Sequence, residues 1–160
     1  KAAASLSTSL QQGKIEKWYQ AVICGKPVDN NGTYVDYLKQ DKKNNCSRIV
    51  DKSDPESKRA ELEYKVLDCI RTEEKDSQYL SLVEIKLLTG RHHQIRVQFS
   101  GHGTPLYGDG KYGNNEKAVR KSLALCACHL KFKHPATGKI MDFQIKPDTG
   151  AFKLFSKSND

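Results

Sequence analysis

The sequence lacks any long apolar run. Its longest hydrophobic stretches, such as Ala21 to Cys24 and Leu123 to Cys128, fall far short of the ~20 residues that a helix needs to cross a bilayer. The N-terminal segment has neither an initiator Met nor a sustained apolar stretch, so we expect no signal peptide. We likewise expect no membrane-spanning helix, and Lys1 need not be the natural start of the protein.

The cysteines lack the pattern of a disulfide-stabilised protein. There are five, an odd number, scattered between Cys24 and Cys128. Such usage is typical of a reducing compartment, so we expect a cytoplasmic protein with free thiols. With 37% hydrophobic and 29% charged residues, the composition is that of a folded chain rather than a disordered one, and 160 residues suffice for a single domain over 1–160.

Common catalytic and metal-binding motifs are missing as well. There is no GxSxG nucleophile elbow and no HExxH pair, and the glycine-rich stretch 101–113 fits neither phosphate-binding motif. Cys126 and Cys128 are followed by His129, but no second pair of ligands completes a four-ligand site. We predict core cysteines and no metal, with a small metal-binding protein as an open alternative.

Positive charge is abundant and unevenly distributed. Lys and Arg number 27 against 19 Asp and Glu, which gives a net charge of +8. Residues 1–80 carry 14 basic and 13 acidic side chains, whereas residues 81–160 carry 13 basic and 6 acidic ones. A basic surface in the second half suits a polyanion, because each neutralised phosphate releases counterions. A soluble protein with solvated lysines is the alternative that charge alone leaves open.

Hydrophobic periodicity predicts an α+β fold with a mixed, mainly antiparallel sheet and few helices. Alternating apolar residues favour a hairpin of 61–71 with 79–90 across the polar RTEEKDSQ turn, and a second hairpin of 123–134 with 139–147. The other expected elements are a helix over 1–12, a strand over 14–24, a turn at 30–32, an exposed loop over 39–45, a short strand over 47–52, a helix after Gly90 and a basic link over 115–122.

The densest polar cluster is Thr89-Gly90-Arg91-His92-His93-Gln94-Ile95-Arg96. We predict a strand-to-helix junction here, with the cations in the first turns of the helix and Ile95 and Phe99 on its apolar face. Cations at a helix start oppose the helix dipole at a cost of about 0.3–1 kcal/mol each, so we expect an anion to bind there. A tolerated, exposed basic helix start is the alternative.

Aromatic residues accompany these cations. Tyr19 lies in the middle of strand 14–24, and Tyr107, Lys111 and Tyr112 lie in the glycine-rich loop. Aromatic rings beside cations are what nucleobases and phosphates require. The alternative for Tyr19 is an ordinary core aromatic.

Residues 87–113, LLTGRHHQIRVQFSGHGTPLYGDGKYG, resemble almost position for position the hallmark of the RluA-type family of RNA pseudouridine synthases. Segment 14–25 is similar to that family's Tyr-x-Ala-Val-x-x-Gly strand, 38–45 to one of its turns and 129–147 to its closing hairpin. The resemblance spans about residues 1–147. It implies a pseudouridine synthase-like core that acts on RNA, either rRNA or tRNA, and needs no cofactor. We also expect a monomer that does not associate with a membrane.

The resemblance also implies roles for individual residues. In that family a uridine is flipped out of the RNA, an aspartate attacks it, and the base detaches, rotates and rejoins through carbon 5. Tyr19 would stack on the flipped base and could remove the carbon-5 proton, while Arg96 would keep the nucleophilic aspartate ionised. We predict both as catalytic residues. The predicted RNA-binding residues, in a basic cleft built by 14–24, 88–100 and 105–113, are Arg91, His93, Lys111 and Tyr112.

One departure from the family outweighs the others. Its catalytic aspartate lies in a His-Arg-Leu-Asp-x-x-Thr-Ser-Gly segment just before the helix that corresponds to 1–12, and this sequence contains no such segment. Either the chain is a piece of a larger enzyme, or it is a relic that cannot catalyse. The rival function is a non-catalytic RNA-binding module. Gln98 and Cys126 also stand where the family usually has histidine.

Overall fold

The computed structural model describes residues 2–73, 78–113 and 121–156, and it confirms the α+β prediction. Most of the predicted basic link at 115–122 lies outside these residues, as does part of the RTEEKDSQ turn. Among the described helices, none is both long and apolar enough to cross a bilayer. The elements are, in chain order, α1 (Ala2–Gln11), β1 (Glu16–Cys24), β2 (Asn31–Asp41), β3 (Cys46–Val50), β4 (Lys58–Arg71), β5 (Tyr79–Leu87), α2 (Gln94–Gly101), β6 (Leu125–Lys133), β7 (Ile140–Gln144) and the 3-10 helix η2 (Gly150–Phe155).

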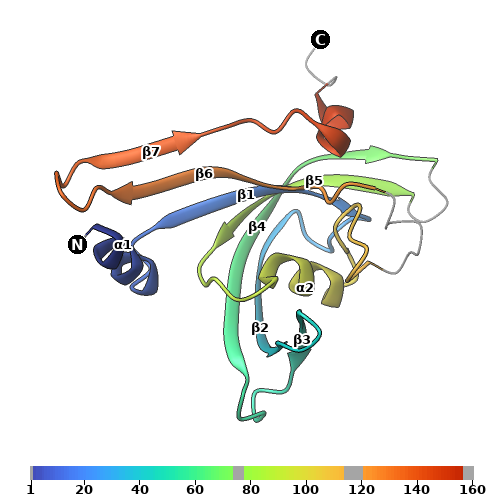
Figure 1. The fold of residues 1–160 in the computed structure, drawn as a ribbon. Helices are drawn as coiled ribbons and strands as arrows, with labels where there is room; N and C mark the ends of the chain where they lie inside the picture. Colours follow the sequence, from blue (N-terminus) through green and yellow to red (C-terminus); the bar gives the residue numbers. More distant parts are fainter. Residues whose placement is uncertain (1, 74–77, 114–120, 157–160) are drawn as a thin grey trace.

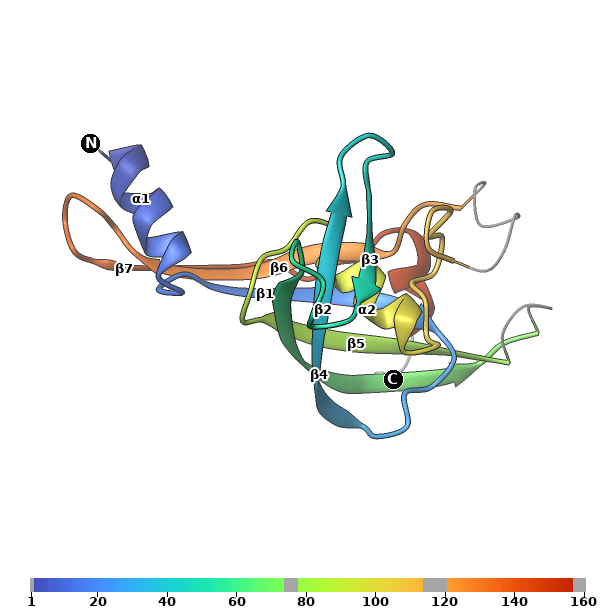
Figure 2. The same ribbon diagram turned by 90° about the horizontal axis from the view of Figure 1, so that it is seen from below.

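The strands described by the structure form one seven-stranded sheet in the order β3-β2-β4-β5-β1-β6-β7, and each neighbouring pair is antiparallel. Both predicted hairpins are confirmed, because β4 pairs with β5 and β6 pairs with β7. Figures 1 and 2 show α2 against the β2–β3 end of the sheet and α1 beside the tip of the β6–β7 hairpin. The two ends of the sheet therefore have different coverings.

Strand β1 is buried on both of its faces toward its C-terminal end. Alternation sends Ala21 and Ile23 into a cluster with Phe99 of α2, as the predicted apolar face of that helix requires. Val22 points the other way and packs with Phe152 of η2. All three β1 residues are fully buried, so this strand is the firmest support for any side chain farther along it.

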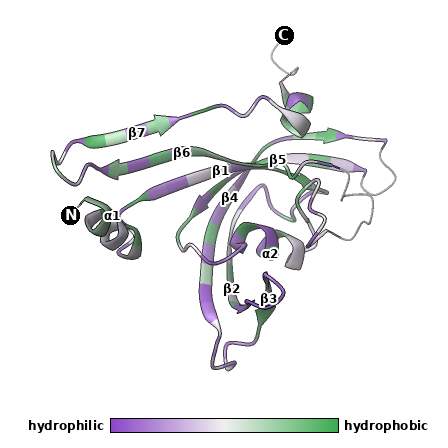
Figure 3. Cartoon of the chain, in the orientation of Figure 1, coloured by the Kyte–Doolittle hydropathy of each residue, from purple (hydrophilic) through white to green (hydrophobic). Residues whose placement is uncertain are grey.

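The β6–β7 end exposes apolar side chains. Figure 3 shows hydrophobic residues along both strands, although β7 forms the edge of the sheet. Phe143 lies opposite Leu130 in the ladder, and 52% and 38% of these two residues are exposed. Ile140 and Ile145 are exposed to more than 60%. Leu130, Phe143 and Ile145 lie on one face of the hairpin, because cross-strand partners and residues two apart share a face, whereas Ile140 alternates to the other face. Exposed apolar residues gathered on one face indicate an interaction surface.

The predicted turn at 30–32 and loop at 39–45 are wrong in extent, because β2 runs from Asn31 to Asp41. Its polar residues resemble a loop in sequence, but β4 on one side and β3 on the other supply backbone partners along its length. The turn itself is short, and Asp41 caps it by accepting hydrogen bonds from the backbone and side chain of Asn44. Backbone pairing with β3 and β4 therefore makes this segment a strand, although its polar side chains favour a loop.

Helix α2 begins three residues later than predicted. The side-chain oxygen of Gln94 accepts hydrogen bonds from the backbone N–H of Arg91 at 2.9 Å and from the Thr89 hydroxyl at 2.8 Å, which closes a turn before the helix. His93, the N-cap residue, has a left-handed backbone with φ 52°. Arg91 and His92 therefore lie in a turn ahead of the helix, and only Arg96 lies within it.

Candidate functional site

Two neighbouring cavities form a basic groove on the α2 side of the sheet. A cavity of about 670 Å³ lies between the end of α1, the start of β1, the end of β5 and the turn before α2. A second cavity of about 430 Å³ lies between β2, β3 and the same turn, and both cavities are lined by Gly90 and Arg91. We call them together the basic groove. Its charged lining residues are Glu16, Lys17, Lys42, Glu56, Lys58, Lys86, Arg91 and His92.

This groove shares two of the three segments of the predicted cleft. Segments 14–24 and 88–100 contribute to it as expected. No residue of 105–113, all of which the structure describes, lines either cavity. Instead, the glycine-rich loop forms hydrogen bonds to α2 through Asp109 and to the β2–β3 hairpin through Lys111 and Tyr112.

Tyr19 lies beside the groove in an apolar hollow of about 270 Å³, whose walls include Ala127, Leu130 and Phe143. Its backbone is fixed between Ile85 of β5 and Ala127 of β6. Burial raises the pKa of the Tyr19 phenol, so the group is protonated and neutral near pH 7. A neutral ring on a rigid strand is suited to stacking on a base, whereas a role in removing a proton requires the phenol to lose its own.

Lys17 connects the two spaces, and it was not among the residues predicted from the sequence. It lines both the larger cavity of the groove and the hollow around Tyr19. Residues two apart on a strand share a face, so Lys17 and Tyr19 point to the same side of β1. That spacing was the available signal. Lysines on strands are so often solvated that the spacing alone does not distinguish a binding residue.

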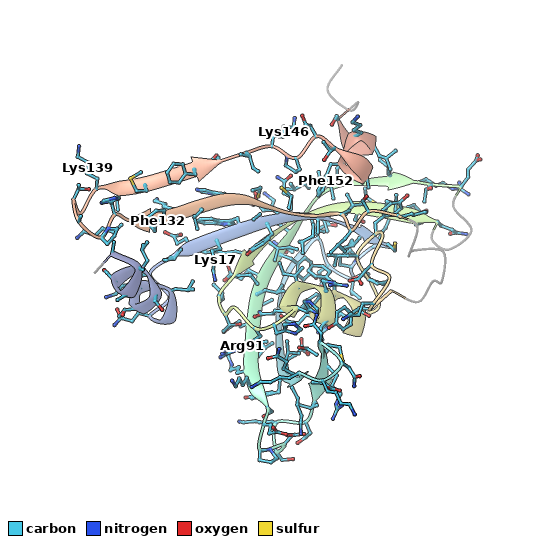
Figure 4. The ribbon with its side chains drawn as sticks, in the orientation of Figure 1. Lys17, Arg91, Phe132, Lys139, Lys146 and Phe152 are labelled. Atoms are coloured by element: carbon cyan, nitrogen blue, oxygen red, sulfur yellow. The ribbon has the colours of Figure 1, made fainter. Side chains whose placement is uncertain are left out.

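Arg91 lies at the junction of the two cavities, near solvent as predicted. Its Nε donates a hydrogen bond of 2.9 Å to the backbone carbonyl of Arg59, which fixes the plane of the guanidinium. Within the described residues, no carboxylate lies within ion-pair distance of Arg91. Its terminal nitrogens can therefore donate to an anion in the groove (Figure 4).

Arg96 has a carboxylate of its own. Its Nε and Nη2 donate to the two oxygens of Asp109 at 2.8 and 2.6 Å, and the Asp109 side chain is fully buried. Burial alone would raise the pKa of Asp109, but the hydrogen bonds from Arg96 and from the backbone N–H groups of Lys111 and Tyr112 outweigh it and hold that pKa below its usual value. The predicted role of Arg96 beside a nucleophilic aspartate stays a prediction, and its observed partner was not foreseen.

His93 and Tyr112 contact each other, whereas they were predicted to contact RNA. The Tyr112 oxygen accepts a hydrogen bond from the backbone N–H of Ser47 at 2.9 Å and shares a second hydrogen bond of 2.8 Å with His93 Nδ1, whose direction is set by the imidazole tautomer. Burial, followed by the charges of His92, Arg96 and Lys111, lowers the pKa of His93, so the imidazole is neutral near pH 7. These groups join the β2–β3 hairpin to the start of α2.

Lys111 and His92 complete the same network. Lys111 Nζ donates to the backbone carbonyl of Asn45 at 2.7 Å. His92 contacts the Ser47 hydroxyl through Nδ1 and the Asn45 side chain through Nε2, at 2.9 and 3.1 Å. The structure therefore brings the predicted residues together, but it directs their polar atoms to the hairpin. Their contact with RNA stays a prediction.

The cysteine cluster considered for a metal is dispersed. His129 stacks on Trp18 with ring centroids 4.1 Å apart, and its Nε2 contacts Asp142 at 2.9 Å. The register of the β1–β6 pair shifts between Trp18 and Tyr19, because β6 has one extra residue there, Cys128. In the part of the chain that the structure describes, no group of three His, Cys, Asp or Glu side chains is placed to hold a metal ion.

Comparison with known proteins assigns this chain to a family. A family model described as RNA pseudouridylate synthase matches residues 1–101, which is well over half of the chain. The chain therefore belongs to the RNA pseudouridylate synthase family, and the resemblance found in its motifs is confirmed.

Individual relatives agree with that class. The chain is 33% identical to ribosomal large subunit pseudouridine synthase D of Zymomonas mobilis, in a match that covers 91% of this chain and 45% of that protein. It is 35% identical to the RNA pseudouridine synthase YlyB of Bacillus subtilis, covering 88% and 43% of the two chains. Human RNA pseudouridylate synthase domain containing 1 has the same fold, with a TM-score of 0.75 at 22% identity over 91% of this chain and 60% of its own. The chain thus spans less than half the length of these two curated relatives.

Proposed function

We propose that this chain is part of an RNA pseudouridine synthase that isomerises uridine to pseudouridine in structured RNA, either rRNA or tRNA. One observation carries the proposal: a groove rich in cations meets an apolar hollow that holds Tyr19, on a chain that belongs to this family. Cations bind the phosphates of an RNA strand, and an aromatic ring in an apolar wall receives a flipped base. The hydrolase and metal-site motifs that would indicate another chemistry are absent from the sequence.

The isomerisation exchanges one bond to the ribose for another. The bond from the ribose to N1 of uracil breaks, the bond to C5 forms, C5 loses its proton and N1 is free to hold one. Atoms and electrons balance without an oxidant, a reductant or a cofactor, so the enzyme supplies a nucleophile and orientation. In this scheme Tyr19 stacks on the base, Arg91 binds a phosphate, and Arg96 supports the site from the helix.

The nucleophile must come from outside these 160 residues, because the sequence has no His-Arg-Leu-Asp-type segment. The exposed apolar face around Leu130, Phe143 and Ile145 favours a piece of a larger enzyme over a relic. Further polypeptide that packs there would lie beside Tyr19, since Leu130 and Phe143 line the same hollow. We infer that this polypeptide is the part of the same protein that bears the aspartate.

Three further expectations belong to this proposal. The five cysteines are free thiols, which supports a cytoplasmic protein. The second expectation is a monomer. The relatives named for the large ribosomal subunit favour rRNA over tRNA as the substrate.

The test compares the 160-residue chain with the longer protein encoded by its gene. Both are incubated with rRNA and tRNA transcripts that carry tritium at carbon 5 of uridine, and tritium release is measured beside RNA binding. We expect release from the longer protein alone, and loss of release with retained binding in its Tyr19→Ala variant. Release from the 160-residue chain would refute a nucleophile supplied from outside it. Binding without release by the longer protein would favour the RNA-binding module.

A further inference from the structure

We propose that Lys17 is a phosphate-binding residue, which holds the RNA phosphodiester next to the nucleotide that lies over Tyr19. The inference deepens the proposed function and rests on it. The site consists of the Lys17 ammonium group, the side-chain-free surface of Gly90 and the larger cavity of the groove between them.

The position of Lys17 is the first step. A Cβ atom placed on Gly90 would lie 3.3 Å from Lys17 Nζ, so the ammonium group reaches from β1 to the turn that precedes α2. Figure 4 shows Lys17 and Arg91 on the same side of the sheet. The ammonium group therefore lies between the aromatic hollow and the guanidinium at the junction of the two cavities.

The charge of Lys17 is unmatched, which is the second step. In residues 2–73, 78–113 and 121–156, no carboxylate lies within ion-pair distance of its Nζ. Glu16, its neighbour, alternates to the opposite face of β1 and is 3.8 Å from Lys86. Partial burial lowers the pKa of Lys17, which shows that the cation is partly removed from water without a compensating charge. A bound anion would stabilise it.

The second lysine of this cavity is engaged elsewhere. Lys86 pairs with Glu16 and lies 5.4 Å from the centre of the Trp18 ring. It therefore has partners that Lys17 lacks. Among the lysines that line the larger cavity, Lys17 is the one whose charge remains available to a ligand.

The anion that fits is a phosphodiester. A cavity of about 670 Å³ accommodates a nucleotide, and its wall continues past Arg91 into the second basic cavity, as the path of a strand requires. The Cα atoms of residues two apart on a strand are separated by about 7 Å, and Lys17 also lines the hollow around Tyr19, so a phosphate at Lys17 can adjoin the nucleotide whose base lies over Tyr19. Lys17 thus fixes the position of the backbone while Tyr19 contacts the base.

The test uses the longer protein with Lys17→Gln, Lys17→Arg and, as a matched control, Lys139→Gln, which removes an exposed lysine from the β6–β7 turn. RNA affinity is measured by filter binding at several salt concentrations, and thermal unfolding checks that each variant folds. We expect Lys17→Gln to weaken binding several-fold and to reduce the slope of log affinity against log salt by about 0.7–0.9, the value of one phosphate. Lys17→Arg should keep the slope, and Lys139→Gln should match the unmodified protein.

The outcomes separate this inference from the proposed function. An unchanged salt slope in a folded Lys17→Gln variant would overturn the phosphate site, even if the unmodified protein makes pseudouridine. A reduced slope supports the site, even if the protein binds RNA without modifying it. The double variant Lys17→Gln with Arg91→Gln should lose about two phosphates, and a slope equal to that of Arg91→Gln alone would overturn an independent contact at Lys17.

Discussion

The two ends of the sheet differ in how their polar and apolar side chains are placed. At the β2–β3 end, buried polar groups pair with one another: Arg96 with Asp109, and Tyr112 with His93 and Ser47. At the β6–β7 end, apolar residues such as Phe143 and Ile145 remain exposed. Most buried polar groups of the first end find partners within the described residues, whereas we propose that the second end packs against further polypeptide. A sequence motif rich in cations therefore supplies internal structure, in addition to the ligand contacts that we propose for it.

The largest effect is expected at the completed end, from Arg96→Ala. The change leaves the Asp109 carboxylate buried without its cation, which costs about 3–5 kcal/mol. Urea unfolding should show a corresponding loss of stability. Arg91→Ala is the control and should change stability by less than about 0.5 kcal/mol, because Arg91 is exposed and makes one hydrogen bond to a backbone carbonyl. Equal stability of the two variants would show that the Arg96–Asp109 pair is not a structural element.

A smaller effect is expected from Tyr112→Phe, which leaves the Ser47 N–H and His93 Nδ1 without their partner. The loss should be about 1–3 kcal/mol. Because the pKa of His93 is lowered in the folded state, the unfolded state binds more protons below pH 6.5. The stability contributed by neutral His93 is therefore present above pH 6.5 and is lost as the pH falls toward the lowered value.

Unfolding measured between about pH 5 and pH 8 tests this dependence. His93→Gln, which cannot be protonated in this range, should remove the part of the pH dependence that arises at this site. If the pH profile of His93→Gln matched that of the unmodified chain, the His93–Tyr112 contact would not depend on a neutral imidazole.

The smallest effect is expected at the open end, from Phe143→Ser in the 160-residue chain. With about half of the residue exposed, the change should cost less than ~1 kcal/mol. In the longer protein, where we propose that this face is covered, the same change should cost about 1.5–3 kcal/mol. Parallel unfolding experiments on the two proteins measure the difference. Equal losses would contradict the proposed covering.

Much of the fold could be predicted from local patterns. The hairpin of β4 and β5 and the helix α1 follow from apolar periodicity, and Gly13, with φ 68°, ends α1 where a terminating glycine was expected. β2 could not be predicted, because its backbone partners in β3 and β4 determine it more than its own side chains do. A helix or strand can be predicted from its local sequence where its own apolar residues form a periodic buried face.

The sequence predicted which residues belong to the candidate site better than it predicted which partners they contact. Tyr19 and Arg91 lie where their patterns placed them, beside a hollow and beside a groove. The partner of Arg96 is 13 positions away in a glycine-rich loop, and no local rule connects the two. The spacing of Lys17 from Tyr19 was a signal in the sequence. The sequence alone, however, does not show whether a lysine has a carboxylate partner in the folded protein.

The burial of β1 from both sides has a consequence for how such a protein can change over time. With Ala21, Val22 and Ile23 fully enclosed, the strand that carries Tyr19 tolerates few substitutions, and under the proposed function it stays in place when RNA binds. Adaptation to a new RNA must then occur in the rim of the groove and at the tip of the β2–β3 hairpin, whose residues face solvent. A lineage can thus exchange the RNA that we propose it recognises while the strand that carries Tyr19 stays the same.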